Sequence, residues 1–191
     1  MGPNGNGKST LLSAIMGNPK YQVTEGSIYL DGQNVLEMSV DERSKAGIFL
    51  GMQYPQEIPG VVTSDFLRAA LNAHQEKPVS LFKFIKELDK NIADLKMDEN
   101  LAHRYLNEGF SGGEKKRNEI LQMKLLKPKF ALLDEIDSGL DVDALKIVSE
   151  AINDMKSDSF GCVMVSHYER LFELVPPSHV HILVDGKIVL S

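Results

Sequence analysis

The sequence predicts an α/β fold with a mainly parallel sheet at its core. Strand-like apolar runs alternate with amphipathic helical patterns along the chain, which is typical of layered α/β proteins. Three of the apolar runs end next to the polar residues Gln53, Asp134 and His167. Because α/β proteins bind ligands at the carboxyl ends of parallel strands, the ends of these runs are candidate site positions.

The first part of the chain predicts a helix over residues 9–16, a hairpin over 27–35 and a buried strand over 47–52. An Asp-Gly pair in the middle of the hairpin is a strong turn signal. The prolines and glycine that follow the strand indicate an irregular segment over 54–60.

Residues 64–126 predict an all-helical insertion between the two halves of an α/β core, residues 1–63 and 127–191. The last helix of the insertion spans about 112–126, and the basic run 115–117 within it is interpreted as mostly exposed charge. In the preceding helix, apolar residues recur every three or four positions and charged residues lie between them on the solvated face. The apolar positions are Phe82, Ile85, Leu88, Ile92 and Leu95, and the charged ones are Lys83, Lys86, Glu87, Lys90 and Asp94.

The last part of the chain returns to alternating strands and helices. It predicts a strand over 130–133, a helix around 143–156, a strand over 162–165 and a hairpin over 180–190 that turns at a second Asp-Gly pair. With 191 residues, the chain suits a single domain that carries an insertion.

Composition excludes several classes of protein. The formal net charge is −6, which argues against nucleic acid or an anionic membrane as the main partner. Cys162 is the single cysteine, so no disulfide can close within the chain and no cysteine cluster can hold zinc or iron–sulfur centres. It is interpreted as a small core side chain. No apolar run approaches the ~20 residues of a membrane span and no secretory signal is visible, so we expect a cytoplasmic protein without direct membrane insertion.

The start of the chain matches the phosphate-binding loop pattern Gly-x-x-x-x-Gly-Lys-Ser. Glycines let successive backbone N–H groups converge on a polyphosphate, the lysine reaches the outer phosphates, and the serine hydroxyl ligates Mg²⁺. A chance glycine-rich turn before a helix is the alternative. The candidate nucleotide-binding residues are Gly2, Pro3, Asn4, Gly5, Asn6, Gly7, Lys8, Ser9 and Thr10.

Such a loop normally follows a buried strand, and here nothing precedes it except Met1. At the other end, the chain stops directly after a strand-like run. We therefore expect that the sequence is a fragment or that its start was assigned at an internal methionine.

Two acidic residues follow the apolar run 130–133. Asp134 is a candidate Mg²⁺ ligand, and Glu135 is a candidate base that orients and deprotonates an attacking water. The alternative is an ordinary buried strand followed by solvated acids.

The predicted helix 112–126 begins with Ser111, Gly112, Gly113 and Glu114. Ser-x-x-Glu is a capping box, which explains the serine and the glutamate. Two glycines in the first turn disfavour a helix and capping does not require them, whereas a backbone that touches a phosphate does. Asp141 is predicted to cap the next helix, around 143–156.

The order of these motifs resembles that of the ATP-binding-cassette (ABC) ATPases, over essentially the whole chain. The resemblance implies a P-loop NTPase fold of the ABC type, with a helical subdomain over 64–126 and small antiparallel hairpins. It makes Gln53 the Q-loop glutamine, Asp141 the D-loop aspartate and His167 the switch histidine, and Ser111–Glu114 the signature. The implied cofactors are ATP and Mg²⁺.

The resemblance also implies roles in the reaction. Glu135, His167 and Gln53 would be catalytic, and the metal would be held by Ser9, Gln53 and Asp134. The signature would complete the ATP site of a second copy, in an ATP-dependent head-to-tail dimer.

Longer stretches are similar to one branch of this family, the SufC-type ATPases of the Suf iron–sulfur cluster assembly system. The stretches are 51–61, 109–123, 134–146 and 166–170. The resemblance implies scaffold partners like SufB and SufD, and no nucleic acid. The chain departs from the family in two ways: it has no counterpart of the strands and adenine-stacking aromatic residue before the P-loop, and none of the C-terminal helix.

Two alternatives remain beside this interpretation. One is the ATP-binding subunit of an ABC transporter, in which the helical subdomain docks a membrane protein. The other is a truncated remnant with impaired nucleotide binding, since unpaired sheet edges and a loop without its strand would weaken the site.

Overall fold

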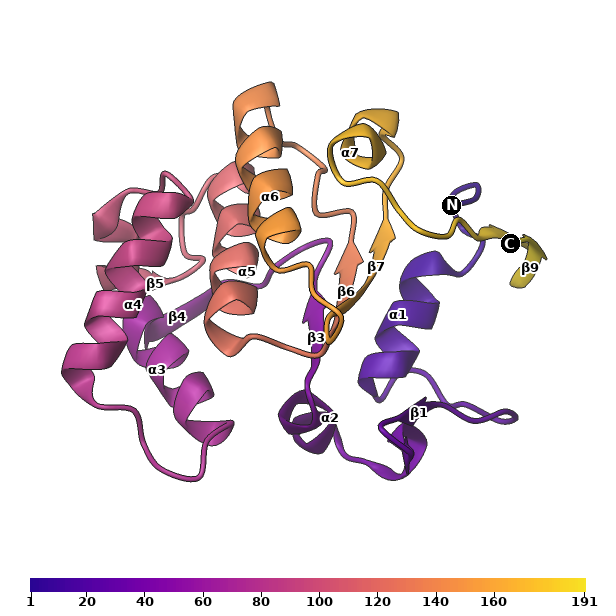
Figure 1. Ribbon diagram of the computed structural model, residues 1–191, viewed down its shortest axis with the longest axis horizontal. Coiled ribbons are helices and arrows are strands. Elements are labelled where there is room, and N and C mark those ends of the chain that lie inside the picture. The colour runs from indigo at the N-terminus through magenta and orange to yellow at the C-terminus, as the bar shows by residue number, and fades with distance from the viewer.

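The computed structural model describes all residues from Met1 to Ser191. Its centre is a parallel sheet of β3 (Ile48–Gly51), β6 (Phe130–Asp134) and β7 (Gly161–Val165), in the order β3-β6-β7 (Figure 1). All three strands run in one direction, so they end at the same edge of the sheet. The predicted parallel α/β core is confirmed.

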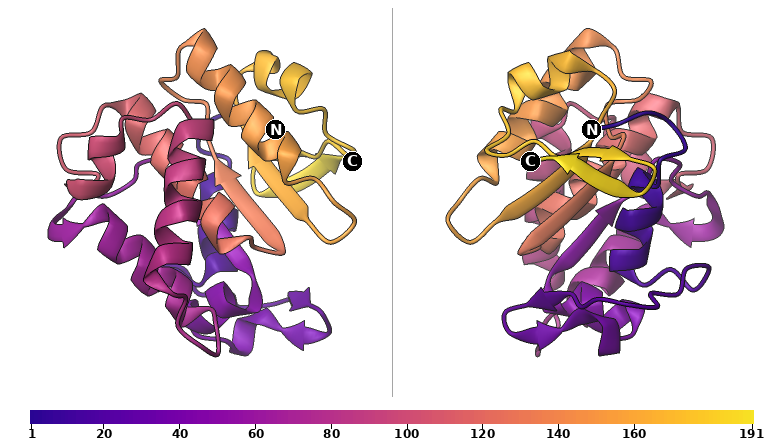
Figure 2. Two further views of the ribbon diagram at one scale, coloured as in Figure 1. Left: turned by 60° about the vertical axis from the view of Figure 1, so that its left-hand side comes forward. Right: turned by 90° about the vertical axis from the view of Figure 1, so that its right-hand side faces the viewer.

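Helices cover both faces of this sheet. Helix α1 (Lys8–Met16) lies on one face, while α5 (Gly112–Leu126) and α6 (Val142–Asp154) lie on the other (Figure 2). Alternation along β6 explains this arrangement, because successive side chains of a strand point to opposite faces. Leu132 packs in a small cluster with Leu12 of α1, whereas Leu133 packs in the main core with α5 and α6.

The region between β3 and β6 is not all-helical. It contains α3 (Thr63–Ala73), α4 (Leu81–Asp94) and a 3₁₀ turn, η2 (Glu99–His103). It also contains β5 (Tyr105–Leu106), which pairs antiparallel with β4 (Ile58–Val62). Strand β4 occupies part of the segment predicted to be irregular. Contacts with a strand more than 40 residues away stabilise it, and no local pattern shows them.

The buried face of α4 also differs from the predicted one. Leu88, Ile92 and Leu95 are buried as expected, but Phe82 is 81% exposed and Ile85 is 45% exposed. Phe84 is buried in their place, at 2% exposure. The start of α4 has more apolar residues than one face can hold, and packing against α5 selects which of them are buried.

Two hairpins form separate small sheets, at the positions predicted. They are β1 (Tyr29–Leu30) with β2 (Gln33–Asn34), and β8 (Ile182–Val184) with β9 (Lys187–Leu190). Both Asp-Gly turns have positive φ at both residues, as a type I′ turn requires. Three short helices were not predicted from the sequence: η1 (Val35–Glu37), α2 (Val40–Ala46) and α7 (Glu169–Leu174).

One continuous core of 26 buried residues joins the sheet to the inserted helices. It includes Phe49 of β3, Leu67 of α3, Phe84 of α4 and Leu133 of β6. Helix α5 connects these parts, since it packs on α3, α4, α6 and β3. None of the helices combines the length and the apolar character that a membrane span needs.

Candidate functional site

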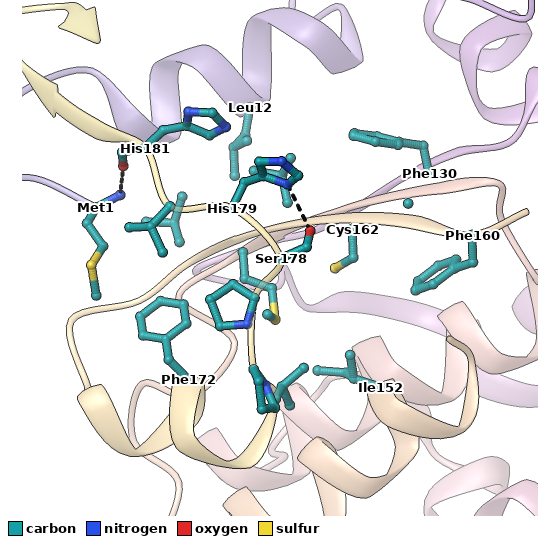
Figure 3. Close-up of a pocket in the computed structure, with 18 of the residues that line it drawn as sticks. Met1, Leu12, Phe130, Ile152, Phe160, Cys162, Phe172, Ser178, His179 and His181 are labelled. Atoms are coloured by element: carbon teal, nitrogen blue, oxygen red, sulfur yellow. Dashed lines mark hydrogen bonds between the residues drawn. The ribbon is translucent and has the colours of Figure 1, made fainter. Parts of the chain in front are cut away.

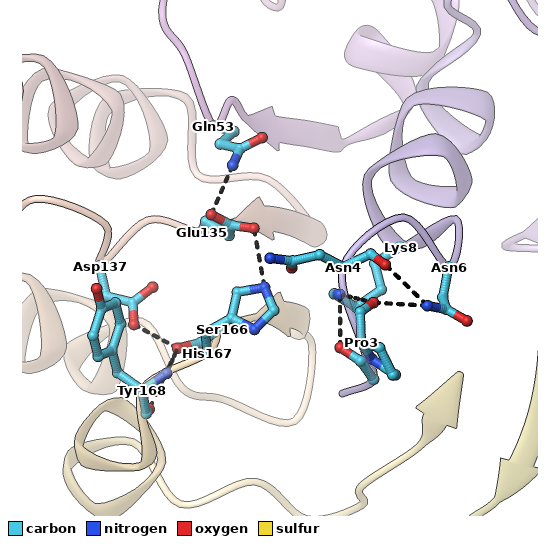
Figure 4. Close-up of polar contacts among 11 residues, drawn as sticks. Pro3, Asn4, Asn6, Lys8, Gln53, Glu135, Asp137, Ser166, His167 and Tyr168 are labelled. Atoms are coloured by element: carbon cyan, nitrogen blue, oxygen red, sulfur yellow. Dashed lines mark hydrogen bonds and ion pairs between the residues drawn. The ribbon is translucent and has the colours of Figure 1, made fainter. Parts of the chain in front are cut away.

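Three side chains from three different strand ends meet at the carboxyl edge of the sheet (Figure 4). The Gln53 amide Nε2 donates a hydrogen bond of 2.7 Å to Glu135 Oε2. His167 Nε2 lies 3.3 Å from the other oxygen, Glu135 Oε1. The Glu135 side chain is 18% exposed, so the carboxylate is held between an amide and an imidazole and still reaches solvent.

The backbone conformation at Glu135 sets the direction of this carboxylate. Glu135 has a φ of 46°, in the left-handed region that a non-glycine residue adopts at a cost of about 1–2 kcal/mol. Its N–H donates to Val165 O at 2.9 Å, which extends the pairing of β6 and β7 by one residue. The chain then turns sharply away, and the side chain stays at the sheet edge.

The glycine-rich loop precedes α1 and requires its glycines. Gly2, Gly5 and Gly7 all have positive φ. Lys8 Nζ folds back over the loop and donates to the carbonyl oxygens of Gly2 and Pro3, each at 2.8 Å. No side chain caps α1, so the first N–H groups of that helix are free to bind an anion.

Asp134, at the end of β6, is 5% exposed, and its buried Oδ1 has no hydrogen-bond partner. Burial raises the pKa of this carboxyl, and the hydroxyl of Ser9 beside it opposes that shift. A buried carboxylate oxygen without a partner, next to a hydroxyl, is a donor set that suits the hard cation Mg²⁺. No cluster of three or more His, Cys, Asp or Glu side chains could hold a metal, so phosphate and water oxygens would complete the shell. Gln53 bonds Glu135 rather than Asp134 or Ser9.

A second buried carboxylate, Asp137, links the turn after Glu135 to the segment that carries His167. Ser166 Oγ donates to Asp137 Oδ2, and the N–H of Tyr168 donates to Ser166 Oγ at 2.9 Å. Burial raises the pKa of Asp137, and the bond from Ser166 opposes that shift. Ser166 and Asp137 are 29 residues apart in the sequence, so no local pattern indicates this contact.

The capping predictions at the helix starts are confirmed. Ser111 and Glu114 form the capping box of α5, and Asp141 Oδ1 accepts from Ala144 N–H at 2.7 Å to cap α6. A Cβ atom built at Gly112 would meet nothing within 4 Å, and one at Gly113 would meet only a leucine side chain at 3.8 Å. Packing within this chain therefore does not require either glycine. No hydrogen bond joins residues 111–114 to the glycine-rich loop, and α1 and α5 cover opposite faces of the sheet.

The basic run of α5 is not mostly exposed, contrary to the prediction. Lys116 is only 4% exposed, and its Nζ donates to the carbonyl oxygens of Met52 and Gln53 at 2.9 and 2.7 Å. Lys115 pairs with Glu57 at 2.7 Å across 58 residues of sequence. Helical spacing alone does not show that the loop after β3 covers this face.

A largely apolar cavity of about 930 Å³ lies beside β7, between α1, α7 and the β8–β9 hairpin (Figure 3). The amino group of Met1 donates to His181 O at 2.6 Å, and Leu183 N–H donates to Met1 O at 2.8 Å, so backbone pairing with β8 anchors the start of the loop. Cys162 lines the cavity, and burial raises the pKa of its thiol to about 12. A partly buried thiol with a raised pKa agrees with the interpretation of Cys162 as a packing residue.

Comparisons with known proteins agree on one family. A family model described as "ABC transporter" matches residues 1–138. The chain is 62% identical to vegetative protein 296 of Bacillus subtilis over 193 residues, covering 100% of this chain and 74% of that protein. It is 60% identical to a probable ABC transporter ATP-binding protein of Streptococcus pyogenes, covering 100% and 75%. It is 49% identical to a probable ATP-dependent transporter of Synechocystis, covering 100% and 76%.

Solved structures show the same fold. A dimeric ATP-binding cassette in a post-hydrolysis state, bound to ADP and Pi, matches with a TM-score of 0.85 and 23% identity, covering 100% of this chain and 82% of that one. A dimeric bacterial ABC transporter cassette matches with a TM-score of 0.84 at the same identity and coverage.

Proposed function

This chain belongs to the ABC transporter family and is an ATPase of that family, and from that premise we propose that it hydrolyses ATP to drive a conformational change in an iron–sulfur cluster assembly scaffold. The observation that carries the catalytic part of the proposal is the convergence of Gln53, Glu135 and His167 from three strand ends onto one carboxylate.

Glu135 is the proposed general base. Its carboxylate accepts a proton from a water molecule whose oxygen attacks the γ-phosphorus, while the bond from that phosphorus to the ADP oxygen breaks. Gln53 fixes the carboxylate and senses the water and metal. His167, on the other side of Glu135, contacts the γ-phosphate.

The glycine-rich loop is the proposed phosphate site. ATP binding exchanges the two bonds of Lys8 Nζ to Gly2 O and Pro3 O for bonds to phosphate oxygens, and the free N–H groups at the start of α1 add further donors. Ser9 and Asp134 would hold Mg²⁺, with Gln53 as a further ligand. When bound, Mg²⁺ neutralises charge on the β- and γ-phosphate oxygens.

A second copy of the chain is the proposed partner in the ATP-bound state. No hydrogen bond joins residues 111–114 to their own glycine-rich loop, and the open space around Gly112 leaves their backbone accessible to the nucleotide of another subunit. Asp141, which caps α6, is proposed as the D-loop aspartate of that interface. Gel filtration of the Glu135→Gln variant with ATP and Mg²⁺ should give a dimer; a monomer at all ATP concentrations would refute this coupling.

The scaffold is proposed to resemble SufB and SufD, in the cytoplasm. The stretches 51–61, 109–123, 134–146 and 166–170, which resemble SufC-type ATPases, support this choice. Two of the relatives are named as a probable ABC transporter ATP-binding protein and a probable ATP-dependent transporter, and these names favour the second candidate, a transporter subunit. Co-purification distinguishes the two, because it yields SufB- and SufD-like proteins in one case and a membrane subunit in the other.

The Glu135→Gln variant tests the enzyme directly. Loss of a positioned base lowers turnover by ~10²–10⁴-fold, so this variant should bind ATP and hydrolyse it slowly, as measured by phosphate release and by retained radiolabelled ATP. Glu150→Gln, on the exposed side of α6, is the matched control and should leave turnover unchanged. Equal turnover in both variants would remove Glu135 from the mechanism.

A further inference from the structure

Two charged side chains of α5 are buried beneath the loop that follows β3. Lys116 and Glu119 are 4% and 6% exposed, and neither belongs to the catalytic or phosphate-binding residues proposed above. They are three residues apart on a helix, so they lie on the same face, one turn from each other.

Both side chains hold the backbone at Met52. Glu119 Oε2 accepts a hydrogen bond from Met52 N–H at 2.9 Å, across 67 residues of sequence. Lys116 Nζ donates to Met52 O at 2.9 Å and to Gln53 O at 2.7 Å. Gln122 Nε2 donates to the other carboxylate oxygen of Glu119 at 3.2 Å, so both of its oxygens are engaged.

A contribution to the stability of the fold does not explain why Lys116 and Glu119 are buried here. Burial of charge is unfavourable unless the charges are paired and hydrogen-bonded, and apolar side chains of similar size stabilise a core at least as well. Burial also raises the pKa of Glu119 to about 7 and lowers the pKa of Lys116. What these side chains add is a fixed direction for the backbone at Met52 and Gln53, and the side-chain amide of Gln53 reaches Glu135.

We propose that Glu119 is a positioning residue for Gln53. Its carboxylate fixes the Met52 N–H from α5, so the chain leaves β3 in the direction that brings Gln53 Nε2 to 2.7 Å from Glu135 Oε2. This inference rests on the proposed ATPase function. It links α5, the helix that begins with residues 111–114, to Gln53, the residue proposed to orient the base Glu135.

The test begins with hydrogen exchange, which needs no ATP. In the complete protein, amide exchange at Met52 should be at least tenfold faster in Glu119→Ala than in the parent, because its hydrogen-bond acceptor is removed. Glu119→Gln keeps an acceptor oxygen, so it should restore slow exchange and serves as the variant of choice if Glu119→Ala folds poorly. Unchanged exchange at Met52 in Glu119→Ala would overturn the inference.

Kinetics then separate positioning from stability. Glu119→Ala should lower kcat by about fivefold or more while the KM for ATP stays within about twofold, and Glu119→Gln should restore kcat. In Gln53→Ala, adding Glu119→Ala should lower kcat no further, because both changes remove one interaction. A multiplicative loss in the double variant would overturn the inference. If the parent protein has no ATPase activity, the proposed function is refuted. The positioning role of Glu119 is then decided by hydrogen exchange at Met52 alone.

Discussion

The two flanks of the parallel sheet are built differently. On one flank, Phe49 of β3 is 8% exposed within the main core, and ions from α5 hold the backbone where β3 ends. On the other flank, Val163 of β7 is 41% exposed beside a cavity, and the glycine-rich loop is anchored to β8 by backbone pairing at Met1. One sheet therefore positions Gln53 by dense side-chain packing on one flank, and on the other it positions the glycine-rich loop by a few main-chain contacts.

The largest expected effect is on the β3 flank. Phe49→Ala should lower the free energy of unfolding by about 3–5 kcal/mol, because it deletes a buried aromatic side chain and leaves a cavity in the main core. Denaturant titration of the complete protein measures it. A loss below about 1 kcal/mol would mean that this flank is as loosely packed as the other.

The pH dependence of stability should come next. Burial raises the pKa of Glu119 to about 7 from 4.5, so between these values the folded protein binds more protons than the unfolded chain. With respect to this group, the free energy of unfolding is therefore highest below about pH 4.5. It falls as the pH rises through 7, by up to ~3 kcal/mol in total.

Titration of Glu119→Gln provides the control for that prediction. Asp134 and Asp137 also have raised pKa values and remain in the variant, so the difference between parent and variant isolates Glu119. Denaturant midpoints between pH 4.5 and 8 should diverge with rising pH. Parallel curves would show that the carboxyl titrates normally.

A smaller effect is expected at the bond between Ser166, which follows β7, and Asp137, which follows the central strand β6. Ser166→Ala leaves a buried carboxylate oxygen of Asp137 without its donor, at a cost of about 1–3 kcal/mol. Thermal unfolding should show the loss, whereas Ser157→Ala, at an exposed serine, should leave the melting temperature unchanged. Equal melting temperatures for both variants would contradict the structural role given to this bond.

The smallest effect is expected on the β7 flank. Val163→Ala should cost less than about 1 kcal/mol, because this side chain is part-exposed and already borders a cavity. Measured with Phe49→Ala under the same conditions, it gives the contrast between the flanks directly. Similar losses for both would remove the contrast.

Local sequence patterns were sufficient for much of the fold. The Asp-Gly pairs predict both hairpins, since only a few residues tolerate the backbone of a type I′ turn. Ser111 and Asp141 are found as helix caps, because capping depends on neighbours within three residues. The three central strands were predicted from their apolar runs, and their parallel pairing places Gln53, Glu135 and His167 together at one sheet edge.

What the sequence left open depends on contacts between distant residues. Glu119 reaches Met52 across 67 residues, and Asp137 reaches Ser166 across 29, so no local window contains both partners. The same holds for the pairing of β4 with β5. Phe84 is buried rather than Phe82 because the position of α5 decides which side of an apolar helix start is covered.

The left-handed backbone at Glu135 has a consequence for how such a protein changes under selection. Glycine and asparagine adopt this conformation at lower cost than glutamate, so a library at position 135 sorted only by melting temperature should enrich both. The same library sorted by catalytic rate should return glutamate. Thermal stability and catalytic rate therefore favour different residues at position 135, and selection for stability alone would discard the proposed proton acceptor.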